Sequence, residues 1–155
     1  MNFRQAEIND ISQLVEMRLG YLIEDHGFLT EEETTRIKES LPSYFENHLG
    51  KDMSIYVGEE DRNIISTVFL LVVEKPANPS FITGKTGTVL NVFTKSQYRK
   101  QGIAGKLMNM MLEDAKDMNL SYVELQATDM GKPLYEKIGF SIQKSEYTPM
   151  KYKLN

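Results

Sequence analysis

The stretch from Val89 to Lys106, VLNVFTKSQYRKQGIAGK, constrains the fold of this chain more than any other part of the sequence. Its first six residues are mostly apolar and β-branched, which predicts a buried strand that ends at Thr94. A polar loop at 95–101 follows, and apolar residues at helical spacing begin after Gly102. A strand that turns through a glycine-containing loop into a helix presents free backbone N–H groups at the positive end of the helix dipole. The pattern therefore predicts a phosphate-binding site.

The spacing excludes two common phosphate-binding motifs. A Walker loop has a glycine five residues before Gly-Lys and a Ser or Thr after it, but Lys100 and Leu107 occupy these positions. A dinucleotide-binding fingerprint needs G-x-G-x-x-G, which Gly102 and Gly105 do not supply. A side chain at either glycine would keep a phosphate away from the backbone, so both are candidate binding residues.

Composition bounds the class of protein. The chain has 155 residues, of which 41% are hydrophobic and 26% charged, so we expect one globular domain over residues 1–155. The net charge of −4 gives no support to a nucleic-acid partner, and no apolar run is long enough to span a membrane. The absence of cysteine excludes disulfides, thiolate metal sites and a cysteine nucleophile. Residues 1–4 do not begin a signal peptide, so we expect a cytoplasmic location. We also expect that the protein binds no metal.

Periodicity and turn signals predict alternating strands and helices. Strands are expected at 1–6, 53–59, 64–74, 89–94, 122–126, 141–144 and 148–154. Helices are expected from Asn9 or Asp10 to a break at 24–27, from Thr30 to about Leu49, from Gly102 to Asn119, and from Pro133 to Gly139. Thr30 and Glu33 have the spacing of a capping box, and residues 60–63 are expected to form a hairpin. The apolar run at 68–73 predicts a central strand of an α/β fold with a mixed sheet.

For several polar features, the sequence allows both a functional role and an ordinary structural one. The loop from Lys75 to Phe81 contains two prolines, and a role in binding or association competes evenly with an ordinary surface crossing. The acidic residues 31–33 can attract a cationic acceptor, but chemistry of the helix start is the favoured explanation. His26 and His48 match no metal or triad pattern and are expected on the solvated surface.

Two motifs resemble those of the GNAT superfamily of acetyl-CoA-dependent N-acetyltransferases. Arg99–Ala104, RKQGIA, is similar to the R/Q-x-x-G-x-G/A signature of the family's pyrophosphate loop. Leu134–Phe140, LYEKIGF, is similar to the L-Y-x-x-x-G-F segment near the family's C-terminus, and lies about thirty residues further on, as it does in the family. The expected order β-α-α-β-β-β-α-β-α-β-β also resembles the GNAT-type acyl-CoA N-acyltransferase fold over essentially the whole chain.

The resemblance implies acetyl-CoA as co-substrate, bound beside the strand that ends at Thr94. It places Val92, Phe93 and Thr94 where the family pairs its backbone with the pantetheine arm. It places the pyrophosphate on Arg99, Lys100, Gln101, Gly102, Ile103, Ala104 and Gly105, with Lys106 close by as a charge partner. Backbone N–H groups near 92–94 are then expected to polarise the thioester carbonyl.

Tyr135 matches the family position that often protonates the departing thiolate. The competing interpretation is a packed tyrosine whose hydroxyl meets solvent, and the motif favours the catalytic one. The family's usual asparagine before this tyrosine is missing, and Thr128 stands near its place.

The chain departs from the family at the general base. Many relatives carry a glutamate on the central strand, but Thr88, Leu90 and Val92, which an alternating strand places on one face, are neither acidic nor basic. Asn91, on the opposite face in such a strand, can position water or substrate. A water chain, Glu24, His26 or no base at all are the alternatives, and they stay open.

The predicted function is transfer of an acetyl group from acetyl-CoA to a primary amine of a small molecule or a peptide. Transfer of a longer acyl group is a second enzymatic hypothesis. A catalytically silent acyl-CoA sensor or interaction module on the same fold is the alternative from another class, supported by the missing strand carboxylate. The family often forms dimers, and Tyr152 and Leu154 on the last predicted strand offer an apolar edge, so a homodimer is expected.

Overall fold

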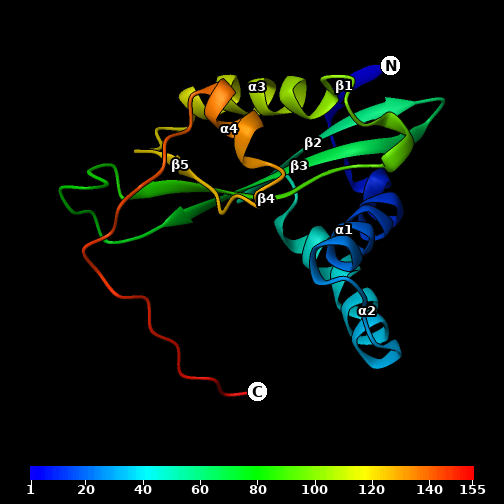
Figure 1. Ribbon diagram of the computed structural model, residues 1–155, viewed down its shortest axis with the longest axis horizontal. Helices are drawn as coiled ribbons and strands as arrows, with labels where there is room; N and C mark the ends of the chain where they lie inside the picture. The colour runs from blue at the N-terminus through cyan, green and yellow to red at the C-terminus, as the bar shows by residue number, and fades with distance from the viewer.

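The computed structural model describes residues 1–155 and confirms a mixed α/β fold (Figure 1). The strands are β1 Asn2–Gln5, β2 Met53–Glu60, β3 Asn63–Glu74, β4 Lys85–Thr94 and β5 Val123–Glu124. The helices are α1 Ile11–His26, α2 Glu31–His48, α3 Ile103–Lys116 and α4 Lys132–Ile138, with 3₁₀ turns η1 Ile8–Asp10 and η2 Ser96–Tyr98. The five strands form one sheet in the order β1-β2-β3-β4-β5. Neighbours are antiparallel except β4 and β5, which are parallel.

Local sequence signals account for most of these boundaries. The Thr30–Glu33 capping box is confirmed, because the Glu33 amide donates to Thr30 Oγ1 at 3.1 Å and the Thr30 amide donates to Glu33 Oε2 at 2.9 Å. Helix α1 ends where Gly27 adopts a positive φ of 84°, a conformation that glycine adopts at little cost. The predicted hairpin between β2 and β3 is confirmed, with Asp61 and Arg62 in the left-handed region. None of the helices is both long and apolar enough to cross a membrane.

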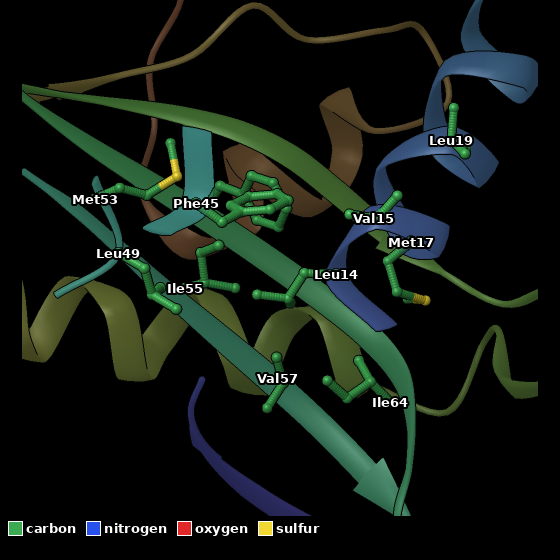
Figure 2. Close-up of a cluster of buried hydrophobic side chains, with 11 residues drawn as sticks. Leu14, Val15, Met17, Leu19, Phe45, Leu49, Met53, Ile55, Val57 and Ile64 are labelled. Atoms are coloured by element: carbon green, nitrogen blue, oxygen red, sulfur yellow. The ribbon is translucent and has the colours of Figure 1, made fainter. Parts of the chain in front are cut away.

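The helices cover the two faces of the sheet in pairs (Figure 1). Helices α1 and α2 pack on one face over a core that Figure 2 shows, in which side chains from both helices meet those of β2 and β3. This core contains Leu14, Val15, Met17, Leu19, Phe45, Leu49, Met53, Ile55, Val57, Ile64 and Phe69. Helix α3 covers the other face with Leu107, Met108 and Met111, all fully buried. Strand β3 lies in the middle of the sheet and contributes to both cores, as its apolar run predicts.

A half-buried ion cluster joins the start of the chain to β2. The Arg4 guanidinium binds Asp10 Oδ2 through Nη1 at 2.7 Å and Glu59 Oε2 through Nε at 2.6 Å. The Glu7 amide also donates to Asp10 Oδ2, at 2.7 Å. The hydrogen bond from Arg4 is the main reason that the pKa of Asp10 lies below its usual value, although burial of the carboxyl opposes it.

The two predicted C-terminal strands, 141–144 and 148–154, are not formed, which corrects the last part of the expected element order. Residues after Phe140 belong to no helix or strand, and Figure 1 shows the end of the chain, in red, running away from the body. Tyr147, Met150, Tyr152 and Leu154 are 84–91% exposed. The alternating pattern was a valid local signal, but a strand is stable only when its backbone pairs with a neighbour. The predicted strand at 122–126 is likewise reduced to two paired residues.

Candidate active site

The sheet opens between β4 and β5. Strand β4 pairs with β3 along most of its length, but it pairs with β5 only at Gly87 and Thr88. From Val89 to Thr94, the edge of β4 that faces β5 therefore has no strand partner. Backbone N–H and C=O groups on such an edge are free to bind an extended ligand. Val92, Phe93 and Thr94, the residues predicted to contact pantetheine, all lie along this opening.

A bulge in β4 changes which side chains face each layer. Thr67 pairs with Phe93 and Phe69 with Leu90, so β4 carries one extra residue at Asn91, whose φ is 54°. The inference that Leu90 and Val92 share a face is therefore wrong. Leu90 packs with the α1–α2 core, and Val92 packs with the α3 core.

The bulge also corrects the predicted side of Asn91. Its side chain is buried on the α1 side, the side of Leu90 and not the opposite one. Asn91 Nδ2 donates to Thr67 Oγ1 at 3.1 Å, and its Oδ1 accepts from Arg18 Nη1 at 3.2 Å. The amide is therefore held between β3 and α1, and it fixes the position of Arg18.

The loop after β4 has the geometry of an anion site at a helix start. Lys100 and Gly102 have positive φ angles of 61° and 76°, and Gly102 is the N-cap of α3. The first backbone bond of α3 runs from the Lys106 amide to the Gly102 carbonyl, so the amides of Ile103, Ala104 and Gly105 have no partner within the helix. A Cβ atom at Gly102 would meet no heavy atom within 4 Å. The space beside Gly102, at the start of these free amides, is therefore open.

The charged residues around this loop have different roles. Arg99 Nε donates to the Thr94 carbonyl at 2.8 Å, and its Nη2 binds Glu24 Oε2 at 2.5 Å, which ties the loop to α1. Lys106 is exposed, and its Nζ lies 4.0 Å from the centroid of the Phe3 ring on β1. Lys100 and Gln101 are exposed on the loop itself. Lys100 therefore remains as a free cation at the loop, while Arg99 fixes its shape.

Tyr135 lies on α4 with its ring packed closely against the chain. A Cβ atom at Gly131 would approach Tyr135 Cε2 to 2.9 Å, so glycine is required there for the ring to keep its place. The ring also meets Phe140 edge-on, with centroids 6.1 Å apart. The pKa of the Tyr135 phenol is raised, mainly by burial and further by Tyr21 of α1. A raised pKa keeps the phenol protonated at neutral pH, which a proton donor requires.

A pocket of about 530 Å³ lies on the α1–α2 side of the sheet. Polar side chains of α2 form one wall, and the apolar side chains of Phe45, Met53, Phe69 and Leu90 form another, while Arg18 reaches in from α1. A volume of this size suits a small molecule. The pocket adjoins the β4 bulge, because Leu90 lines it and Arg18 binds Asn91.

His48 lines this pocket, and its side chain is partly exposed to solvent. Its ring stacks on Tyr44 with centroids 4.4 Å apart, and its Nδ1 lies 2.8 Å from Asp52 Oδ1. His26 is exposed, with Nε2 3.6 Å from Asp25 Oδ2. Glu24, the other candidate base, is held by Arg99.

Sequence reasoning missed three features of this region: the inward direction of Arg18, the contact of His48 with Asp52, and the contact of Gly131 with Tyr135. Arg18 falls within the first predicted helix, and no local pattern marks an arginine that points inward. The i,i+4 spacing of His48 and Asp52 is a signal for their contact, but it crosses the end of α2, where helical spacing is not expected to hold. Gly131 precedes the predicted helix at Pro133, and nothing in the sequence marks its contact with Tyr135. No group of three residues that could hold a metal ion is present.

Comparison with known proteins identifies the family. The model of the acetyltransferase (GNAT) domain matches residues 51–142, more than half of the chain. Glucosamine 6-phosphate N-acetyltransferase of Arabidopsis thaliana is 29% identical over 149 residues, which are 93% of this chain and 94% of that protein. The solved structure of that Arabidopsis enzyme superposes with a TM-score of 0.67, at 26% identity over 96% of this chain and 97% of the other.

A second solved structure is more similar in shape. It is a protein of Clostridium acetobutylicum described as a predicted acetyltransferase and determined with acetyl-CoA. It superposes with a TM-score of 0.84, at 30% identity over 97% of this chain and 95% of that one. An opened sheet, a glycine-containing loop at the start of α3 and a tyrosine on α4 are thus found in a chain that belongs to the GNAT acetyltransferase family.

Proposed function

We propose that the protein transfers the acetyl group of acetyl-CoA to a primary amine of a small molecule or peptide. The opening between β4 and β5 is the observation that carries this proposal. Along Val89–Phe93, the edge of β4 that faces β5 has no strand partner, and an uncapped helix start lies at one end of the opening. The phenol of Tyr135 on α4 lies close enough to Tyr21 of α1 for Tyr21 to raise its pKa. The acetyl-CoA in the Clostridium structure gives independent support for the co-substrate.

The residues present fit coenzyme A. The free amides at Ile103, Ala104 and Gly105 suit a pyrophosphate, and the open space at Gly102 leaves room for it. Lys100 adds a positive charge to the loop. The unpaired edge of β4 suits the two amides of pantetheine, which can pair with it as an additional strand would.

The chemistry needs few side chains. Acetyl-CoA supplies an acyl group activated as a thioester. A backbone N–H at the β4 bulge donates to the carbonyl oxygen, where negative charge develops. The Tyr135 phenol, protonated at neutral pH, gives its proton to the departing sulfur.

The attacking amine must lose a proton, and few side chains near the pocket can accept it. Glu24 is occupied by Arg99, and His26 is exposed beside Asp25. Neither the α1-facing Leu90 nor Asn91 is acidic. Water in the pocket, next to the His48 ring that Asp52 orients, is the route that the arrangement favours.

The acceptor is proposed to be a small molecule. The Arabidopsis relative is named for its action on glucosamine 6-phosphate, a small amine, and the pocket volume of about 530 Å³ suits a compact ligand. The second candidate is a silent acyl-CoA sensor, which the lack of a carboxylate on β4 favours.

Replacement of Tyr135 by phenylalanine tests the enzymatic proposal. The change removes one oxygen and keeps the ring contacts with Gly131 and Phe140. Since general acid catalysis contributes about 10²- to 10⁴-fold, the single-turnover rate of thiol release should fall by that factor while acetyl-CoA affinity is kept. Tyr147→Phe, in the exposed C-terminal segment, is the matched control and should behave as the wild type.

The outcomes separate the candidates. Equal single-turnover rates in the wild type and Tyr135→Phe would remove the acid role. Tight acetyl-CoA binding without thiol release, across a broad panel of amines, would favour the sensor. Loss of acetyl-CoA affinity in step with the rate would mean that the hydroxyl holds the co-substrate.

A further inference from the structure

Arg18 is a half-buried cation without an acidic partner. It projects from α1 into the pocket, where its only hydrogen bond is the one to Asn91 Oδ1 at 3.2 Å. Its guanidinium carbon lies 5.6 Å from the centroid of the Tyr21 ring. No carboxylate forms a salt bridge with it, although other arginines of the chain, such as Arg4 and Arg99, do have such partners. Most of the five N–H donors of Arg18 are therefore unused by the protein.

The side chains that line the pocket carry positive charge and no negative charge. None of its lining residues is acidic, and Arg18 is the one that carries a permanent charge. Tyr21, Tyr44 and Asp25 are the titratable groups that act on Arg18 through space, and only Asp25, one turn beyond Tyr21 on α1, is an acid. Burial lowers the pKa of Arg18, which reflects the cost of keeping this cation out of water. An arginine so placed is stabilised when an anion enters.

The position of Arg18 relates this charge to the proposed chemistry. Asn91 links Arg18 directly to the β4 bulge, beside the opening where the acetyl group is proposed to lie. A ligand held by Arg18 therefore needs only a short span to place another group at the bulge. The hydroxyls of Ser40 and Ser43 and the amide of Asn47 line the same pocket and can bind further polar groups.

We propose that Arg18 binds an anionic group of the acceptor, and that the acceptor is a compact amine that also carries a carboxylate or a phosphate. The inference rests on the proposed function, because it takes this pocket as the acceptor site. Either anion presents two oxygens that match the fork of the guanidinium. A polyamine, in contrast, would bring further positive charge to a pocket that has no carboxylate to receive it.

Matched pairs of amines test the proposal and distinguish the two anions. Glucosamine 6-phosphate is compared with glucosamine, and a series of amino acids with their carboxamides, with spermidine as the cationic probe. In the wild type, kcat/KM for one anionic member should exceed that of its neutral twin by about 10- to 100-fold. In Arg18→Gln, kcat/KM for the anionic member should fall to about that of its neutral twin, while kcat/KM for the neutral twin should stay unchanged. Arg18→Lys, which keeps the charge and loses the fork, should lie between them.

Arg36→Gln is the matched control, since Arg36 is an exposed arginine on the outer surface of α2, and it should keep the wild-type preference. Thermal unfolding checks that each variant is folded. A preference that survives in Arg18→Gln, or a wild type that prefers the neutral twins or spermidine, would overturn the proposal.

Binding measurements separate the two proposals if no amine is acetylated. Calorimetry then compares the same twins on the wild type and on Arg18→Gln. Tighter binding of an anionic amine that is lost in Arg18→Gln would support the role of Arg18 while the enzymatic proposal fails. Equal binding of the twins, or none at all, would overturn the role of Arg18.

Discussion

Replacement of Gly102 by valine is the most direct perturbation of the proposed phosphate loop. The folded protein has room for the side chain, because a Cβ atom there meets nothing within 4 Å. The backbone conformation, with φ at 76°, costs a non-glycine residue about 1–2 kcal/mol of stability. The same open space is where a pyrophosphate would approach the amides of Ile103 and Ala104.

The expected loss of affinity follows from the contacts that the side chain would block. A hydrogen bond to a charged group contributes about 1.5–3 kcal/mol, so displacing the phosphate from one such amide weakens acetyl-CoA binding roughly 10- to 150-fold. Calorimetric titration with acetyl-CoA measures this directly. Thermal unfolding of the same samples measures the separate cost of the backbone strain.

Gly50→Val is the matched control for this experiment. Gly50 has φ at 77° and equally open surroundings, but it lies after α2, away from the loop. The two variants should lose similar stability, and only Gly102→Val should lose affinity. Gly58 is unsuitable, because a Cβ atom there would lie 3.2 Å from Ile103 Cγ2, at the start of α3. If Gly102→Val is folded and binds acetyl-CoA as Gly50→Val does, the phosphate-loop assignment is refuted.

Two further predictions concern stability and association. The pKa of Asp10 is lowered in the folded protein, so its pairing with Arg4 stabilises fully above about pH 4, and this contribution is lost as pH falls through the folded pKa. In urea unfolding from about pH 7 to pH 2.5, the stability advantage of the wild type over Asp10→Asn should therefore shrink towards low pH, and an advantage independent of pH would contradict the ion pair. The exposed Tyr147, Met150, Tyr152 and Leu154 lead us to propose a homodimer. Light scattering should give twice the chain mass for the full chain and the chain mass after removal of 145–155, and a monomeric full chain would end the idea.

Sequence alone predicted those elements whose signals are local. The capping box of α2, the β2–β3 hairpin and the glycine at the start of α3 each depend on residues within a few positions of one another. The central place of β3 followed from an apolar run with no polar alternation. These signals were sufficient to locate the loop, whereas the tyrosine of α4 was located by the resemblance of Leu134–Phe140 to a family motif.

The features that could not be predicted depend on contacts distant in the sequence. The strands expected after Phe140 have the correct alternation, but no neighbouring strand pairs with them. Arg18 and Asn91 are 73 positions apart, so their contact leaves no mark on either local pattern. The same is true of the bulge, which becomes visible only when β4 is paired with β3.

The bulge at Asn91 also limits which changes of length this strand can tolerate. It allows β4 to supply Leu90 and Phe93 to one layer and Val92 to the other. Deletion of one residue here would exchange the faces of the following side chains or shift them by one position against β3, which would break the bond between Ser66 and Thr94 at 2.7 Å. Substitutions along β4 act on one site at a time, whereas a change of length at Asn91 would alter both cores at once. In this part of the chain, the number of residues is under a stricter constraint than their identity.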